Sequence, residues 1–182
     1  ESEHYLSSEK YDKDKSYWLS RFEPSEKDIF PTISPSTSTT SRRKSYFLED
    51  SLRCKLYHVS STNNISIQHL YIAAIGIYSA KRYGVNIVPM GSVVHNRNNK
   101  AKRDIAGMLT GNLATSLHVL SQENVKELIG RIKKQQRSDF KHQRMPISHL
   151  QKFLGRDRLF EIMFNYQPLD FFADFSGAMG ST

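Results

Sequence analysis

Histidine is the side chain best suited to proton transfer near neutral pH, and the chain has seven histidines. His142, followed by Gln143, invites a catalytic interpretation, but no carboxylate or nucleophile stands at a diagnostic spacing from it. We therefore favour the view that this pair holds a helix–loop–helix corner by hydrogen bonds to the backbone. The other histidines occur singly, at no spacing typical of metal ligands, so we predict no metal site.

Two amide side chains, Asn165 and Gln167, are the stronger candidates for a functional role. They lie in residues 159–167, where polar or long side chains alternate with the apolar set Phe160, Ile162, Phe164 and Tyr166. Alternation with a period of two predicts a strand, and it places both amides on the face opposite the apolar one. From the sequence alone, a substrate-binding face and a solvated sheet face are about equally good interpretations of these amides.

Length and cysteine usage narrow the class of protein. The chain of 182 residues suffices for one domain with a core and is too short for two. Its one cysteine, Cys54, excludes an internal disulfide and is typical of a reducing cytoplasm, where we expect the protein to lie. No apolar run could span a bilayer, so we expect no membrane contact. The start, Glu1 to His4, lacks signal-peptide features and looks like a cut through a longer polypeptide.

The net charge of +8 has two explanations. Its basic clusters, residues 42–44, 100–103 and 131–144, could form a nucleic-acid surface, because phosphate contacts favour grouped Lys and Arg. They could also be solvated faces of helices and loops. We favour solvated faces, since no aromatic and basic signature of nucleic-acid binding accompanies the charge.

Periodicity predicts helices that alternate with strands. An α/β layer with a mixed, partly parallel sheet is therefore the expected architecture. The predicted helices are residues 9–22, 50–60, 66–83, 121–140 and a short one starting at Pro146; the predicted strands are 45–49, 86–94, 108–120 and 159–167; and residues 31–41 and 96–104 are predicted loops.

Two predicted helices carry specific signals. Ser66 and Ser121 are the expected N-caps, and Gly84 is the expected C-cap of the first helix. The first helix is predicted to bury Leu70, Ala73, Ala74, Ile77 and Tyr78, and the second Val125, Leu128, Ile129 and Ile132. Gly107 and Gly111 indicate close backbone approach or a bulge near the start of the third strand.

Four segments, in order, resemble the condensation-domain family of nonribosomal peptide synthetases. The first resembles the helix that leads in from the family's catalytic lobe, and the others resemble its "NR…GMFxNxLPL", "HQDVP" and "R…PLFxxMFNYQ" stretches. The matching residues are Tyr11, Asp14, Tyr17 and Trp18; then Asn96, Arg97, Gly107, Met108, Asn112 and Leu113; then His142, Gln143 and Pro146; and finally Arg156, Phe160 and residues 161–167.

The sequence departs from the family pattern in several places. Ala114 replaces a proline, Arg144 replaces an acidic residue, and Gly111 and Asn112 stand where an Asn-Thr pair is usual. The family's catalytic His-His-x-x-x-Asp-Gly motif is absent, and the sequence has no adjacent histidines. By family order the motif would precede Glu1. We therefore expect no catalytic residue in this chain.

The resemblance implies a chloramphenicol-acetyltransferase-like lobe, a mixed sheet covered by helices. It implies a lead-in helix in residues 1–30, a Ser/Thr/Pro-rich loop in 31–44, and a truncated C-terminal condensation lobe in 45–182. By resemblance, the face bearing Asn165 and Gln167, with Met108 and Thr110, looks onto a tunnel where two substrates meet.

The implied activity is amide-bond formation between carrier-tethered thioesters. The implied partners are the N-terminal lobe of the same domain, carrier proteins and an adenylation domain in cis. No cofactor would bind directly, because the substrates travel on the phosphopantetheine of the carriers. We expect the fragment alone to be inactive and to pair with a second copy. The alternatives are a stand-alone acyltransferase of the same superfold and, less favoured, a basic nucleic-acid-binding module.

Overall fold

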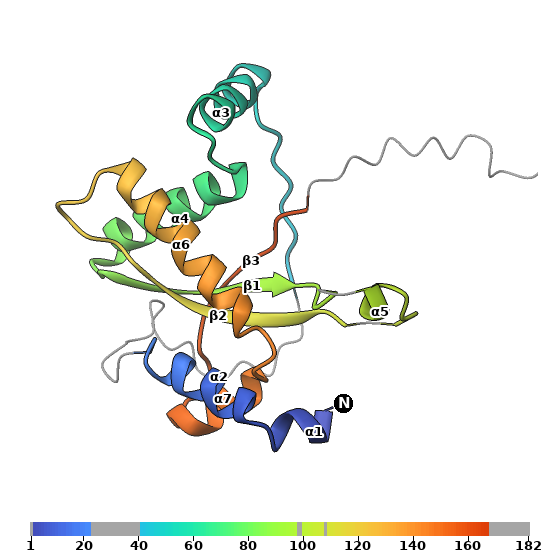
Figure 1. The fold of residues 1–182 in the computed structure, drawn as a ribbon. Coiled ribbons are helices and arrows are strands. Elements are labelled where there is room, and N and C mark those ends of the chain that lie inside the picture. Colours follow the sequence, from blue (N-terminus) through green and yellow to red (C-terminus); the bar gives the residue numbers. More distant parts are fainter. Residues whose placement is uncertain (1, 23–40, 98–99, 108, 168–182) are drawn as a thin grey trace, which may run out of the picture.

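A three-stranded mixed sheet lies at the centre of the protein (Figure 1). The computed structural model describes residues 2–22, 41–97, 100–107 and 109–167. The strands are β1 (Ile87–Val94), β2 (Gly111–His118) and β3 (Ile162–Phe164), in the order β2-β1-β3. β1 pairs with β2 antiparallel and with β3 parallel, so the predicted mixed sheet is confirmed.

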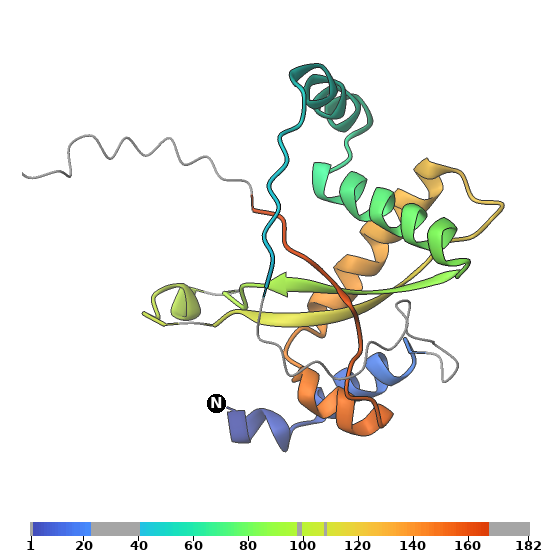
Figure 2. The ribbon, with the colours of Figure 1, turned by 180° about the vertical axis from the view of Figure 1, so that it is seen from behind.

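Helices pack on both sides of the β1–β2 hairpin (Figures 1 and 2). On one side lie α4 (Ile67–Tyr83) and α6 (Val125–Lys141), and on the other lie α2 (Glu9–Leu19) and α7 (Ile147–Leu154). The first core contains Ile72, Ala73, Val88, Met90, Leu117, Leu128, Ile129 and Ile132. The second contains Trp18, Phe22, Val94, Leu113, Ala114, Met145, Leu150 and Leu159.

The ends of these helices follow from local capping. Ser8 begins α2 by accepting a hydrogen bond from the Tyr11 amide, and Gly84 ends α4 in the left-handed conformation at φ 64°. α6 begins later than predicted, because Asn124, and not Ser121, is its N-cap. The Asn124 side-chain oxygen accepts a hydrogen bond from the backbone N–H of Glu127, and the Glu127 carboxylate accepts one from the backbone N–H of Asn124. This reciprocal capping box is a stronger start signal than Ser121.

The buried face of α4 differs from the prediction. His69, Ile72, Ala73, Gly76 and Ser79 are buried, whereas Ala74 and Tyr78 are exposed and Leu70 and Ile77 are half-buried. Gly76 explains the rotation, because a Cβ there would overlap the Leu117 side chain on β2. The helix approaches the sheet through its smallest residue, and close packing decides the face more than side-chain hydrophobicity does. In α6, Val125 is likewise exposed, contrary to the prediction.

Residues 41–49 form no strand, contrary to the prediction for residues 45–49. They are extended and exposed, and the side chains of Tyr46 and Phe47 are 83% and 97% exposed. A strand needs a partner for its backbone groups, and none of the described residues pairs with this segment. α3 (Asp50–Asn63) follows, three residues longer than predicted. Two short helices were not predicted, α1 (Ser2–Leu6) and α5 (Lys100–Arg103). The predicted loop of residues 31–41 lies outside the described residues, except for Ser41.

Gly91, in the central strand, makes room for Phe160. A Cβ on Gly91 would overlap the Phe160 ring, which therefore lies directly against the backbone of β1. This contact guides the chain from Leu159, which is 2% exposed, into β3 beside β1. The glycine thus fixes the position of the third strand.

We expect Gly91→Ala to lower the free energy of unfolding by roughly 1–3 kcal/mol, because overpacking forces the ring and the strand apart. Urea unfolding measures the loss. Phe160→Leu in the same chain should restore part of it, since the shorter side chain frees the space. Equal losses with and without Phe160→Leu would contradict the proposed contact.

Candidate functional site

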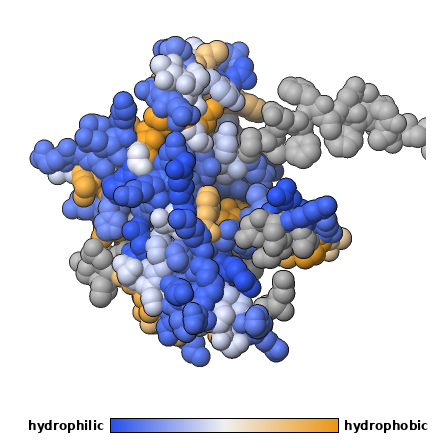
Figure 3. All heavy atoms as spheres, viewed as in Figure 1, coloured by the Kyte–Doolittle hydropathy of each residue, from blue (hydrophilic) through white to orange (hydrophobic). Residues whose placement is uncertain are grey.

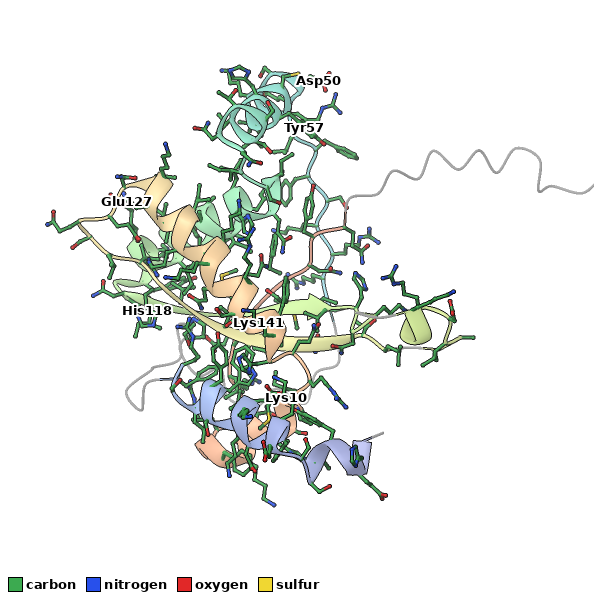
Figure 4. The ribbon with its side chains drawn as sticks, in the orientation of Figure 1. Lys10, Asp50, Tyr57, His118, Glu127 and Lys141 are labelled. Carbon is green, nitrogen blue, oxygen red and sulfur yellow. The ribbon has the colours of Figure 1, made fainter. Side chains whose placement is uncertain are left out.

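His142 belongs to a closed polar cluster centred on Asp14. The Asp14 side chain is 0% exposed and accepts three hydrogen bonds. The donors are the Tyr5 hydroxyl at 2.7 Å, the Lys10 ammonium at 2.5 Å and His142 Nδ1 at 2.6 Å. Lys10 also donates to the carbonyl of Lys141, where α6 ends (Figure 4). These bonds tie the beginning of the chain to the corner between α6 and α7.

A second buried carboxylate, Asp139, extends the cluster. It accepts from the Tyr17 hydroxyl at 2.6 Å and from the Thr115 hydroxyl at 3.1 Å. Burial raises the pKa of Asp139, and the two hydroxyl donors partly offset that rise. The Tyr17 ring stacks on His142 with centroids 3.9 Å apart, and the Trp18 indole donates to the His142 carbonyl at 2.9 Å.

This cluster has a structural role, because its hydrogen bonds connect segments that lie far apart in the sequence. Burial and the neighbouring carboxylates raise the pKa of both Tyr5 and Tyr17 well above the usual range, so both remain protonated donors. The His142 ring nitrogen Nδ1 points at Asp14, and its side chain is only 20% exposed. The corner continues through Pro146, which is the N-cap of α7. The His142 side chain does hold this corner, but it binds the Asp14 carboxylate and not the predicted backbone group; its own carbonyl accepts from the Trp18 indole.

Asn96 and Arg97 stabilise the connection between β1 and β2, residues 95–110, which we call the excursion. Asn96 adopts a positive φ of 51° and donates to the Leu109 carbonyl at 3.0 Å. The Arg97 guanidinium donates to the carbonyls of Arg103, Ile105 and Gly107 at 2.7–3.1 Å. A Cβ on Gly111 would lie 2.8 Å from Asn96 Nδ2, so this glycine permits the close approach. The excursion, with α5 in it, projects beyond the sheet (Figure 1).

β3 is shorter than the predicted strand of residues 159–167, because it covers only Ile162–Phe164. Exposure nevertheless alternates from residue 162 to residue 167: Ile162, Phe164 and Tyr166 are half-buried, whereas Met163, Asn165 and Gln167 are exposed. The two amides therefore lie exposed just beyond the end of β3. Of the other tunnel candidates, Thr110 is exposed at the end of the excursion, and Met108 lies outside the described residues. Of the four tunnel candidates, Asn165, Gln167 and Thr110 are thus exposed.

A small cavity of about 30 Å³ lies between α6 and the sheet. Ile72, Met90, Leu117 and Ile132 form its apolar wall, and Ser92, Thr115, Gln135, Gln136 and Asp139 form its polar wall. The volume suits one water molecule and excludes a substrate. Sequence reasoning missed Asp139. The signal that could have found it is its spacing: Asp139 follows Ile132 by seven residues, which places both on the buried face of α6.

In the described part of the chain, no group of three or more His, Cys, Asp or Glu side chains could hold a metal ion. None of the described helices has the length and apolar character needed to cross a membrane.

We expect Asp14→Asn to lower the free energy of unfolding by roughly 3 kcal/mol, because three donors would lose their buried, charged acceptor. Urea unfolding measures the effect. Asp12→Asn is the matched control on the same helix; its side chain is exposed, so the change should stay within about 0.5 kcal/mol. Equal effects of the two substitutions would show that the cluster contributes no net stability.

Comparisons with known proteins point to one family. The family model described as "Condensation domain" matches residues 1–177. The "Dimodular nonribosomal peptide synthase" of Bacillus subtilis (strain 168) is 28% identical over 183 residues, which cover 98% of this chain and 8% of that protein. The chain thus spans only a small part of the curated relatives it matches.

Solved structures share the fold. The first condensation domain of the CDA synthetase superposes with a TM-score of 0.74 at 20% identity, covering 91% of this chain and 36% of that one. The starter condensation domain of rhizomide synthetase, a mutant in complex with C8-CoA and Leu-SNAC, gives 0.71 at 24% identity, covering 91% and 38%. The fold is therefore the chloramphenicol-acetyltransferase-like one. Because the family model extends over nearly the whole chain, this protein belongs to the condensation-domain family.

Proposed function

We propose that this chain is the C-terminal lobe of a condensation domain that forms amide bonds in a nonribosomal peptide synthetase. The family match over residues 1–177 carries the proposal. It favours this function over a stand-alone acyltransferase and over a nucleic-acid-binding module. The positions of the residues that match the family motifs support it too. Each connects two segments of the chain by hydrogen bonds, as seen for Trp18, Asn96, Arg97 and His142.

The parts of the chain take different roles in this proposal. Residues 1–30 follow a catalytic N-terminal lobe, and residues 45–182 belong to the C-terminal lobe. Residues 31–44 are the loop that connects these two parts. The N-terminal lobe supplies the His-His-x-x-x-Asp-Gly motif. An adenylation domain in cis supplies activated amino acids, and carrier domains bring them on phosphopantetheine arms. The assembly works in the cytoplasm. The outer edge of β3 would accept another strand of the complete domain or, in the isolated fragment, a second copy.

The reaction requires two tethered substrates to meet. The amine of the acceptor attacks the carbonyl carbon of the donor thioester, so a C–N bond forms and the C–S bond breaks. The amine loses a proton, and the carrier thiol of the donor is released. This chain binds and orients: the exposed amides of Asn165 and Gln167 donate to the thioester carbonyl or to the pantetheine arm, with Thr110 beside the same path. Positioning of this kind converts a bimolecular reaction into an effectively unimolecular one.

The isolated chain of 182 residues should form no amide bond. It has no adjacent histidines, and general acid–base assistance alone contributes about two to four orders of magnitude in rate. Mass spectrometry of a mixture of two loaded carrier domains, with the chain or with the complete domain added, measures the product. Product from the chain above a protein-free control would contradict the assignment of the chemistry to the N-terminal lobe.

In the complete two-lobe domain, Asn165→Ala should slow amide formation and leave stability nearly unchanged, because the side chain is exposed. Phe164→Ala, on the half-buried face, should instead lower the free energy of unfolding by about 2 kcal/mol. Single-turnover rates and urea unfolding of both variants separate the two effects. If Asn165→Ala destabilised the protein and Phe164→Ala slowed the reaction, the functional face of β3 would be the other one.

A further inference from the structure

The short helix α1 is attached to the rest of the described chain through one buried ring. Of the α1 side chains that the structure describes, only Tyr5 is buried, at 5% exposure, whereas Glu3, His4 and Leu6 are exposed. A helix of five residues has no stability of its own, so α1 depends on the contacts of this ring. The lower part of the molecule in Figure 3, where α1 and α2 lie, is mainly hydrophilic, which agrees with attachment at a single point.

Three residues enclose the Tyr5 ring, and we call them the Tyr5 socket. Asp14 accepts a hydrogen bond from the Tyr5 hydroxyl at 2.7 Å, and the Tyr11 ring meets the Tyr5 ring edge-on with centroids 5.5 Å apart. The guanidinium carbon of Arg144 lies 4.3 Å from the Tyr5 ring centroid, where a cation is attracted by the ring quadrupole. Asp14 and Tyr11 belong to α2, whereas Arg144 lies in the corner between α6 and α7. The socket is therefore complete only when both segments are in place.

Arg144 is the residue of the Tyr5 socket that departs from the family pattern, in which an acidic residue is usual. An acidic side chain over the ring would be repelled by the negative face of the aromatic system. It would also be repelled by the neighbouring charge of Asp14, whose side chain is 0% exposed. Arginine has the sign that both groups attract. The cation at position 144 and the buried Tyr5 are thus matched to each other.

Loss of the socket would release α1 and leave α2 in place. α2 has contacts of its own, because the Trp18 indole donates to the His142 carbonyl and the Tyr17 hydroxyl donates to Asp139. These contacts do not involve α1, and the N-terminal end marked in Figure 1 lies beside α1. The Tyr5 ring therefore decides the direction from which the chain enters this lobe.

We propose that Arg144 is a positioning residue for amide formation that acts through Tyr5. It keeps the ring in its socket and so fixes the direction of α1, and with it the position of the N-terminal lobe that α1 follows. This inference rests on the proposed function, because it assumes that the catalytic lobe precedes α1. The two substrates react only when both lobes hold them in register, and a small displacement of bound groups lowers the rate strongly.

The experiment uses the complete two-lobe condensation domain and changes residue 144 in two ways. Arg144→Glu introduces the acidic type that is usual in the family, and Arg144→Lys keeps a cation over the ring. Arg144→Glu is also made together with Tyr5→Leu, which removes the aromatic face. Lys152→Glu is the matched control, because it makes the same change in charge at an exposed position on α7.

Three measurements follow α1, the lobes and the chemistry separately. Hydrogen exchange in residues 2–8 reports the local opening of α1. Distances between two spin labels report how the lobes are placed; one label is on the exposed Cys54 and the other on an exposed cysteine introduced in the N-terminal lobe. Amide formation from small N-acetylcysteamine thioesters gives kcat and KM.

We expect Arg144→Glu to speed hydrogen exchange in residues 2–8 roughly fivefold, which is the order of a partly buried cation–π contact. The distribution of distances between the lobes should broaden. The value of kcat should fall while KM changes little, because the substrates still bind but are less well aligned. Arg144→Lys should restore most of each property, and Lys152→Glu should behave like the unchanged domain. With Tyr5→Leu already present, Arg144→Glu should add little further effect.

Unchanged hydrogen exchange in α1 of Arg144→Glu would overturn the proposal, and so would equal effects of that change with and without the Tyr5 ring. Faster exchange with unchanged distances and unchanged kcat would reduce the socket to a structural contact and overturn the positioning role. If Arg144→Glu fails to fold, as thermal unfolding shows, Arg144→Gln removes the charge alone and takes its place in every comparison. If the unchanged domain formed no amide, the proposed function would fail, while exchange and distances would still decide whether Arg144 holds α1.

Discussion

The fold depends on one carboxylate that is removed from water. Asp14 cannot be left unpaired in the interior, because a buried charge without partners costs several kcal/mol. Its donors come from α1, α2 and the end of α6, so the charge is satisfied only when those segments meet. The same arrangement brings Tyr17 to Asp139 and the Trp18 indole to the His142 carbonyl. The two cores, which share the β1–β2 hairpin and residues 159–164, are thereby held in one relative orientation.

Glycines set the distances between the layers once that orientation is fixed. Gly76 lets α4 settle against Leu117, Gly91 lets Phe160 lie on the central strand, and Gly111 lets Asn96 close the excursion. In each case a Cβ would occupy space that a neighbouring side chain uses, so the packing could not be reached with alanine. Gly130 differs, because its missing Cβ faces open space on the outside of α6. The packing that accounts for the other three does not account for it.

The polar residues of the chain therefore divide into two groups. The first group forms hydrogen bonds within the chain and keeps its segments in place; it contains Asp14, His142, Asp139 and Arg97. The side chains of Asn165 and Gln167, by contrast, are exposed. This division agrees with the proposal that the chain forms one wall of a reaction chamber and leaves the chemistry to another lobe.

The sequence alone determined the family, the mixed sheet, most helices and the alternating exposure of residues 162–167, because these depend on local periodicity and on ordered motifs. Tertiary structure decided the rest. It turned α4 so that Gly76 faces the sheet, and it left residues 45–49 unpaired, since strand pairing depends on a partner far away in the chain. It also joined Asp14 to His142 across 128 residues. The partner of a buried charge is set by which segments meet in space, and no local pattern of residues records that meeting.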